Sequence, residues 1–249
     1  MKGIVLAGGL GKRLAPLTDI TNKHLLPVYD RPMIYHPIET LVQAGCKDVL
    51  VVVGGDHAGD FMRLLGDGSS FGLRRLDYAY QKEELGIAHA ISLAEPWMQG
   101  ERMCVILGDN IFERGIKREW NQYKKQSRGA RVLLKEVANA SDYGVAEMDG
   151  VKVKKIVEKP KRPKSSYAVV GAYFFDTAVF RIIKSLKPSR RGEFEVTDIN
   201  NAYIKKRQLS YSILDGIWAD CGASIDSYLD AQNLMARIRR IDKKSRAKR

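Results

Sequence analysis

Glycines and cationic residues gather near the N-terminus, where they could bind a phosphate group. The stretch GGLGKR at residues 8–13 follows an apolar run, and Lys23 lies ten residues beyond Arg13. A glycine-rich turn leaves backbone N–H groups free to face an anion. A guanidinium group offers several donors to phosphate oxygens. The stretch therefore favours a phosphate-binding loop, with a glycine turn beside surface cations as the alternative.

Two common phosphate-binding motifs do not fit this stretch. A P-loop requires GxxxxGK followed by Ser or Thr, but Leu6 replaces its first glycine and Arg13 follows Lys12. The dinucleotide fingerprint GxGxxG has Leu14 at the position of its third glycine. The loop is therefore of another type, GGxGxR.

Two acidic residues next to glycines could hold a metal ion. Asp109 follows an apolar run in ILGDN, and Asp220 lies in WADCG. Ligands of open α/β sheets collect at the carboxyl ends of strands. Mg²⁺ is commonly held by one or two carboxylates together with phosphate oxygens and water. Each acid could instead cap a turn, but the pair favours a Mg²⁺ site formed by Asp109 and Asp220.

The composition predicts a globular cytoplasmic protein that acts on small anions. The chain has 249 residues and a net charge of +13, of which the stretch RIRRIDKKSRAKR at 237–249 supplies +7. A basic surface favours anionic small molecules, and we expect the terminal run to be a solvated tail rather than a nucleic-acid site. No apolar run approaches the roughly 20 residues that span a bilayer, and we expect no signal peptide. The three distant cysteines are expected to be reduced thiols.

The arrangement of apolar runs predicts the elements that position these residues. Strand patterns at 3–8, 48–55, 75–81 and 103–109 alternate with helix patterns at 32–45, 58–68 and 86–98. Such alternation is typical of a mostly parallel sheet covered by helices on both faces. The later strand patterns follow one another with short turns, which favours a mixed or antiparallel part; they lie at 130–137, 143–150, 153–160 and 167–176. Helices are predicted near 177–186, 195–206 and 224–240.

The motifs together resemble those of the sugar-1-phosphate nucleotidylyltransferases, in particular the branch that uses dTTP. The resemblance covers residues 1 to about 240 and includes the motif VEKPKRPKSSYAVVGAYFFD, and its more specific segments are RPMIYHP within NKHLLPVYDRPMIYHPI and RGEFEVTD within RGEFEVTDIN. It implies an α/β Rossmann-like nucleotidyltransferase fold with a mostly parallel mixed central sheet, flanking helices and a smaller sugar-binding β-rich part. It also implies one domain at 1–237, with a nucleotide-binding half at about 1–125 and a sugar-phosphate-binding half at about 126–237. A basic tail would follow at 238–249.

The implied reaction is a Mg²⁺-dependent transfer of a nucleotidyl group from dTTP to glucose 1-phosphate, which yields dTDP-glucose and pyrophosphate. The alternatives are the same transfer from UTP, a related sugar-1-phosphate nucleotidylyltransferase, or a non-catalytic protein that binds nucleotide sugars. The resemblance also implies a homo-oligomer without nucleic-acid or membrane partners.

The resemblance assigns roles to individual residues. The residues implied in catalysis are Arg13, Lys23, Asp109 and Lys159. Those implied in nucleotide binding are Leu6, Gly8, Gly9, Gly11, Arg13, Gln81, Gly86 and Asp109. Those implied in sugar-phosphate binding are Asn110, Gly144, Glu158, Lys159, Val170, Gly171, Arg191 and Glu193. His24 and His89 are expected to be packed residues without a role in proton transfer.

Overall fold

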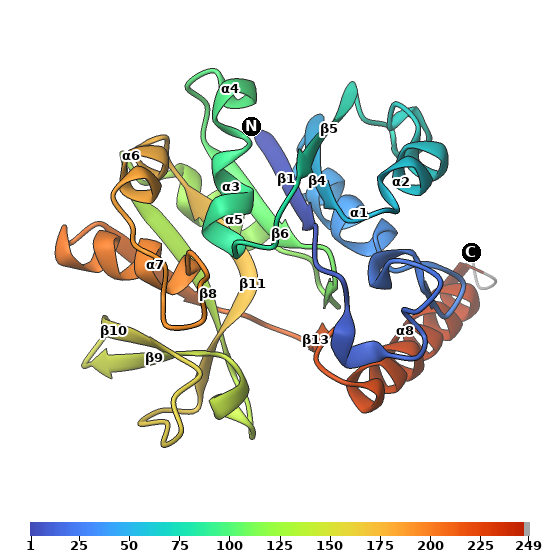
Figure 1. Ribbon diagram of the computed structural model, residues 1–249. Coiled ribbons are helices and arrows are strands. Elements are labelled where there is room, and N and C mark those ends of the chain that lie inside the picture. Colours follow the sequence, from blue (N-terminus) through green and yellow to red (C-terminus); the bar gives the residue numbers. More distant parts are fainter. Residues whose placement is uncertain (247–249) are drawn as a thin grey trace.

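The protein is described by a computed structural model that covers residues 1–246 (Figure 1). One continuous sheet lies between two layers of helices. Within the described residues, none of the helices combines the length and apolar character needed to cross a bilayer. All three cysteines are buried and free, as predicted.

The first half of the chain forms the parallel part of the sheet. Strand β1 (Lys2–Ala7) lies between β4 (Asp48–Gly54) and β6 (Met103–Leu107), and β5 (Arg75–Gln81) pairs with β4. All of these pairings are parallel, as the alternation of strands and helices predicts. The carboxyl ends of the strands therefore meet at one edge, where the glycine-rich loop follows β1, Gln81 ends β5 and Asp109 follows β6.

The second half of the chain adds the mixed part of the sheet. Its five strands are β8 (Ala130–Glu136), β9 (Gly144–Asp149), β10 (Lys152–Glu158), β11 (Tyr167–Phe175) and β12 (Leu209–Ile213). Strand β11 runs antiparallel to β6 and joins the two halves, and it also pairs with β8 and with the start of β9. Strands β9 and β10 form a hairpin that extends from the sheet (Figure 1). The predicted mixed α/β fold is confirmed.

The strands alternate their side chains between two hydrophobic layers. Ile4 and Leu6 of β1 pack on one face, whereas Val5 and Ala7 pack on the other. The first face is covered by α3 (Ile87–Ser92), α4 (Glu95–Met98), α6 (Ala178–Lys184) and α7 (Val196–Lys205). The second face is covered by α1 (Tyr35–Ala44), α2 (Ala58–Leu65) and α5 (Lys117–Lys124). Because both of their faces are buried, β1, β4 and β6 are mostly apolar, whereas the edge strand β5 is only partly buried and carries polar residues.

A third, smaller hydrophobic cluster holds the C-terminal helix α8 (Ile225–Arg246) against short strands. These strands are β2 (Pro27–Val28), β7 (Asn110–Phe112) and β13 (Trp218–Asp220), and the cluster also contains Met33, which follows β3 (Arg31–Pro32). Tyr228 of α8 donates a hydrogen bond to the carbonyl of Pro27. The cluster fixes the segment that follows the glycine-rich loop next to the strand that carries Asp220.

Some elements differ from those predicted. The helix predicted at 86–98 is two short helices, with Pro96 in the first turn of the second. Helix α5 and strands β7, β12 and β13 lie in segments for which we predict no element. Part of the predicted tail continues α8 to Arg246, and residues 247–249 of that tail lie outside the described residues. The division into two halves at about residue 126 stays a prediction.

Candidate active site

The glycine-rich loop begins where β1 ends and packs closely on its neighbours. A Cβ atom built on Gly8 would lie 2.6 Å from Oε1 of Gln81, so a larger residue would collide with the end of β5. Gly11 has a φ of +73° and turns the chain into a 3₁₀-helix, Lys12–Leu14, which contains Arg13. The loop therefore holds Arg13 beside the carboxyl ends of the parallel strands.

The backbone of this loop already contacts an anionic group in the structure. The N–H of Leu10 donates a hydrogen bond of 2.7 Å to the Glu84 carboxylate. Arg13 is exposed and acts electrostatically on Tyr143 and Asp220. The loop thus offers the two donor types, backbone N–H and guanidinium, that bind phosphate groups.

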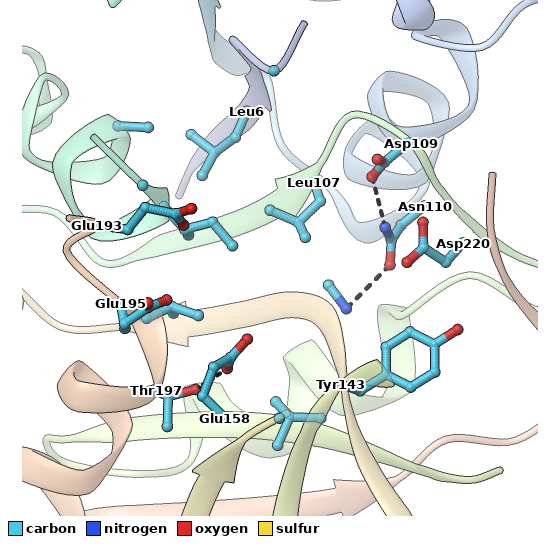
Figure 2. Close-up of a pocket in the computed structure, with 18 of the residues that line it drawn as sticks. Leu6, Leu107, Asp109, Asn110, Tyr143, Glu158, Glu193, Glu195, Thr197 and Asp220 are labelled. Atoms are coloured by element: carbon cyan, nitrogen blue, oxygen red, sulfur yellow. Dashed lines mark hydrogen bonds between the residues drawn. The ribbon is translucent and has the colours of Figure 1, made fainter. Parts of the chain in front are cut away.

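One predicted metal ligand, Asp109, lies in the turn between β6 and β7, and the other, Asp220, lies on the strand that pairs with β7. Asp109 follows β6 after one glycine, and Asp220 ends β13, which pairs with β7 so that Asp220 lies opposite Asn110. The N–H of Cys221 donates to the Asp109 carbonyl at 2.9 Å. Figure 2 shows the side chains of Asp109, Asn110 and Asp220 grouped at one end of a pocket. The pairing of β13 with β7 therefore brings the two acids together.

Lys23 forms a buried ion pair with Asp109. Its ammonium nitrogen lies 2.5 Å from Oδ2 of Asp109, and the side chain of Asn110 donates to Oδ1 at 2.9 Å. Lys23 is 9% exposed and Asp109 is 7% exposed. Burial alone would raise the pKa of Asp109, but the Lys23 charge and the hydrogen bonds from Lys23 and Asn110 together hold it below its ordinary value. Asp109 is therefore ionised at neutral pH.

Asp220 has the opposite electrostatic environment. Burial and the neighbouring Asp109 carboxylate raise its pKa from 3.8 to about 6. Among the described residues, no group of three or more His, Cys, Asp and Glu side chains forms a metal cluster. Two adjacent carboxylates without further protein ligands fit a magnesium ion, which takes its other ligands from phosphate and water. The donor set therefore fits Mg²⁺.

The raised pKa of Asp220 predicts a pH-dependent change in stability. Because the folded state disfavours the ionised form, the cost of that charge is absent below about pH 4, grows as the pH rises from the ordinary pKa of 3.8 to the folded-state pKa of about 6, and is complete above that pH. We expect Asp220→Asn to stabilise the metal-free protein by up to about 3 kcal/mol at pH 8 and by only about 1 kcal/mol at pH 4.5. Thermal melts with a chelator at both pH values check this. Equal stabilisation at the two pH values would contradict it.

The opposite end of the pocket carries Glu158 and Lys159. Thr197, at the start of α7, donates a hydrogen bond of 2.6 Å to Oε2 of Glu158 (Figure 2). Lys159 has a φ of +40°, and its N–H donates to the carbonyl of Tyr143 at 3.0 Å. Left-handed backbone at a residue other than glycine is strained and is concentrated at functional sites. The conformation fixes the direction in which Lys159 leaves the strand.

Arg191 lies among three carboxylates at the same end. One of its terminal nitrogens lies 2.8 Å from a Glu195 oxygen and 3.6 Å from oxygens of Glu158 and Glu193. These acids hold the guanidinium at the rim of the pocket. Partial burial alone would lower the pKa of Arg191, but the three carboxylates raise it above its ordinary value. This end of the pocket therefore carries both hydrogen-bond donors, from Arg191, and acceptors, from the three carboxylates.

These groups border one cavity of about 380 Å³. Sixteen of the eighteen predicted site residues line it: Leu6, Gly8, Gly9, Arg13, Lys23, Gln81, Gly86, Asp109, Asn110, Gly144, Glu158, Lys159, Gly171, Arg191, Glu193 and Asp220. Gly11 does not, because it turns against Lys23. Val170 does not, because neighbouring residues of a strand point to opposite faces, and its side chain packs in the core beneath the second helix layer.

The cavity also contains residues that the sequence analysis did not predict as site residues. The polar and aromatic ones include His24, Glu84, Tyr143, Thr197, Asn200 and Trp218. Within the described part of the chain, both polar side-chain atoms of Asn200 are buried without a hydrogen-bond partner. A bound molecule could satisfy this amide. The helical spacing of Thr197 and Asn200 within VTDIN, three residues apart, was a signal that could have identified them.

Comparison with known proteins identifies the family. The family model described as Nucleotidyl transferase matches residues 2–237. A glucose-1-phosphate thymidylyltransferase of Mycolicibacterium smegmatis is 45% identical over 96% of this chain and 83% of its own length. One of Neisseria meningitidis is 43% identical over 89% of this chain and 78% of its own length.

Solved structures agree with these relatives. A glucose-1-phosphate thymidylyltransferase of Bacillus anthracis in complex with sucrose has a TM-score of 0.90 and 47% identity, with 94% of each chain covered. A UDP-glucose pyrophosphorylase complexed with UDP-glucose has a TM-score of 0.83 and 27% identity, covering 95% of this chain and 98% of that one. The chain described here therefore belongs to the nucleotidyl transferase family and is a nucleotidyltransferase.

Proposed function

We propose that the protein transfers a thymidylyl group from dTTP to glucose 1-phosphate, forming dTDP-glucose and pyrophosphate. The names of its relatives support this substrate pair. The observation that carries the proposal is the single cavity that joins the glycine-rich loop, the Asp109–Asp220 pair and the Glu158–Lys159 end. A cavity with an anion-binding loop, a paired acid site and a second polar end suits two phosphorylated substrates.

The arrangement suggests how the two substrates are placed. The loop at 8–13 and Arg13 bind the triphosphate, and the apolar walls around Gln81 hold the base. Glu158 and Asn200 bind sugar hydroxyl groups, since both line the cavity and the buried Asn200 amide has no hydrogen-bond partner within the described residues. Lys159 binds the phosphate of the sugar. In this arrangement of the two substrates, the α-phosphate of the nucleotide and the phosphate of the sugar would meet next to Lys23.

The chemistry requires that two anions meet. A phosphate oxygen of the sugar phosphate attacks the α-phosphorus, and the bond to the oxygen that bridges the α- and β-phosphates breaks. Arg13, Lys23 and Lys159 reduce the repulsion between the substrates and stabilise the charge that develops on the leaving pyrophosphate. Holding the attacking oxygen and the leaving pyrophosphate in line with the α-phosphorus provides the remaining rate enhancement, so no covalent intermediate with the protein is needed.

Asp109 and Asp220 are the residues that would hold Mg²⁺. When bound, the ion supplies positive charge to phosphate oxygens without any transfer of protons. The ion pair with Lys23 keeps Asp109 ionised and in place. Cytoplasmic location and a homo-oligomeric state stay predictions.

A substrate panel tests the proposal. Initial rates of pyrophosphate release are measured with dTTP, UTP, dCTP, ATP and GTP, each combined with glucose, galactose, mannose and glucosamine 1-phosphates. We expect dTTP with glucose 1-phosphate to give the highest kcat/KM. The similarity to a UDP-glucose pyrophosphorylase favours UTP transfer as the second candidate. A rate with UTP several-fold above that with dTTP would replace the first proposal by the second.

A further inference from the structure

The side chain of Asn110 makes hydrogen bonds that no role assigned so far explains. Its oxygen Oδ1 accepts from the indole N–H of Trp218 at 2.6 Å and from the backbone N–H of Gly171 at 3.1 Å. Its amide nitrogen donates to Oδ1 of Asp109 at 2.9 Å (Figure 2). The residue is 1% exposed. The Asn110 amide is therefore a buried link between Trp218 of β13 and the acid pair.

The chemistry of these partners allows only one orientation of the amide. An indole N–H and a backbone N–H can only donate, and an ionised carboxylate can only accept. Rotating the Asn110 amide by half a turn would place its NH₂ group against the two donors and its oxygen against Asp109. All three hydrogen bonds would then be lost in a buried site, where unsatisfied polar groups are costly. Trp218 and Gly171 together therefore keep the amide nitrogen directed at Asp109.

The backbone at Gly171 is shaped for this contact. The pairing of β11 with β8 is irregular between Val169 and Tyr173, and the N–H of Gly171, within this interruption, donates to Asn110. A Cβ atom built on Gly171 would lie 2.4 Å from Oδ1 of Asn110. A larger residue at position 171 would displace the amide, so the glycine makes room for Asn110.

These bonds leave the oxygen of Asn110 no capacity for a substrate. A carbonyl oxygen accepts two hydrogen bonds through its two lone pairs, and Trp218 and Gly171 occupy both. The ring of Trp218 is held in turn by an edge-on contact with Tyr143, with the ring centroids 5.0 Å apart. The arrangement suits a group that orients Asp109 better than one that binds a sugar through the amide oxygen.

We propose that Trp218 is a positioning residue that orients the Asp109 carboxylate through Asn110. Asn110 holds one carboxylate oxygen and Lys23 holds the other, so the group cannot turn freely. Hydrogen bonds that orient a metal-binding side chain strengthen metal binding, and their loss typically weakens it. The inference rests on the proposed function, because it requires that Asp109 and Asp220 hold Mg²⁺ during the reaction.

The test compares Trp218→Phe, which keeps an aromatic ring but loses the indole N–H, with Trp97→Phe as the matched control. Trp97 also donates a hydrogen bond of 2.6 Å to a side-chain oxygen, that of Asp77, but it does not line the cavity. After thermal melts show that the variants are folded, Mn²⁺ is used as a probe of the Mg²⁺ site. Its binding is measured by electron paramagnetic resonance with a saturating nucleoside triphosphate, the one that the substrate panel selects, and without sugar phosphate. We expect Trp218→Phe to weaken Mn²⁺ binding about tenfold and Trp97→Phe to leave it near the original value.

A double-mutant cycle tests whether Trp218 acts through Asn110. Asn110→Ala removes the link, so adding Trp218→Phe to it should cause no further loss of Mn²⁺ affinity. Losses that add in the double variant would show that Trp218 acts by another route and would overturn the proposal. Unchanged Mn²⁺ binding in Trp218→Phe alone would overturn it as well.

Steady-state kinetics separate positioning from direct contact with a substrate. We expect the Mg²⁺ concentration that gives half the maximal rate to rise in Trp218→Phe, while the KM for the sugar phosphate stays near its original value. A raised KM for the sugar phosphate with an unchanged Mg²⁺ dependence would show that the indole binds the sugar, and the positioning role would be wrong. If the substrate panel selects a pair other than dTTP and glucose 1-phosphate while Trp218→Phe still weakens Mn²⁺ binding, the proposed substrates are wrong and the role of Trp218 stands.

Discussion

Replacing Asp109 by Asn is expected to lower kcat/KM by on the order of 10²–10³-fold or more. The carboxylate is the ionised member of the acid pair and the ion-pair partner of Lys23. Asparagine keeps the size of the side chain but removes the charge that would hold Mg²⁺ and orient the ammonium group. Steady-state rates of pyrophosphate release over a range of Mg²⁺ concentrations measure the effect. Excess Mg²⁺ should not restore the rate, because the ligand itself is missing.

Asp48→Asn is the control for this experiment. Asp48 is also 7% exposed and forms an ion pair with Arg74, but it begins β4 at the opposite edge of the sheet. Both variants lose one charge of an ion pair, which is buried for Asp109 and partly exposed for Asp48, so both should melt at lower temperature and Asp48→Asn by the smaller amount. Only Asp109→Asn should lose turnover. Turnover within a few-fold of the original in Asp109→Asn would contradict the site as described.

Replacing Arg13 by Ala is expected to be the other severe change, lowering kcat/KM by on the order of 10²-fold. Arg13 lines the cavity and its charge acts on Asp220 at the acid pair. Without it, two negatively charged substrates and two carboxylates would share the cavity with one fewer cation. The KM for the nucleoside triphosphate should rise more than the KM for the sugar phosphate. Full kinetics with each substrate varied in turn check this difference.

Lys12 provides the matched control, since it is also cationic and exposed in the same 3₁₀-helix but does not line the cavity. Lys12→Ala should leave both KM values nearly unchanged. Arg13→Lys should recover part of the lost rate, because it restores the charge without the planar set of donors. Equal losses in Lys12→Ala and Arg13→Ala would indicate a general effect of surface charge rather than a phosphate site.

The parallel half of the fold could be predicted from local patterns. Apolar runs such as DVLVVVG are fully buried strands, and the glycine after a helix pattern, as at Gly45, marks where α1 ends. These features depend on residues close together in the chain, so the sequence displays them directly. Short elements such as β13, with three residues, carry no periodic signal and could not be predicted.

The sequence by itself determined the chemical inventory: a glycine-rich turn with Arg13, two acids beside glycines, and a family resemblance carried by motifs in order. Only the tertiary structure determined which of these residues lie next to one another. Lys23 pairs with Asp109 across 86 residues of sequence, and Asp220 joins them through the pairing of β13 with β7. The alternation of side chains along β11 points Val170 away from the cavity, and helix α7 places Asn200 in the cavity lining. Contacts between distant residues depend on how whole strands and helices pack, and no local pattern records that packing.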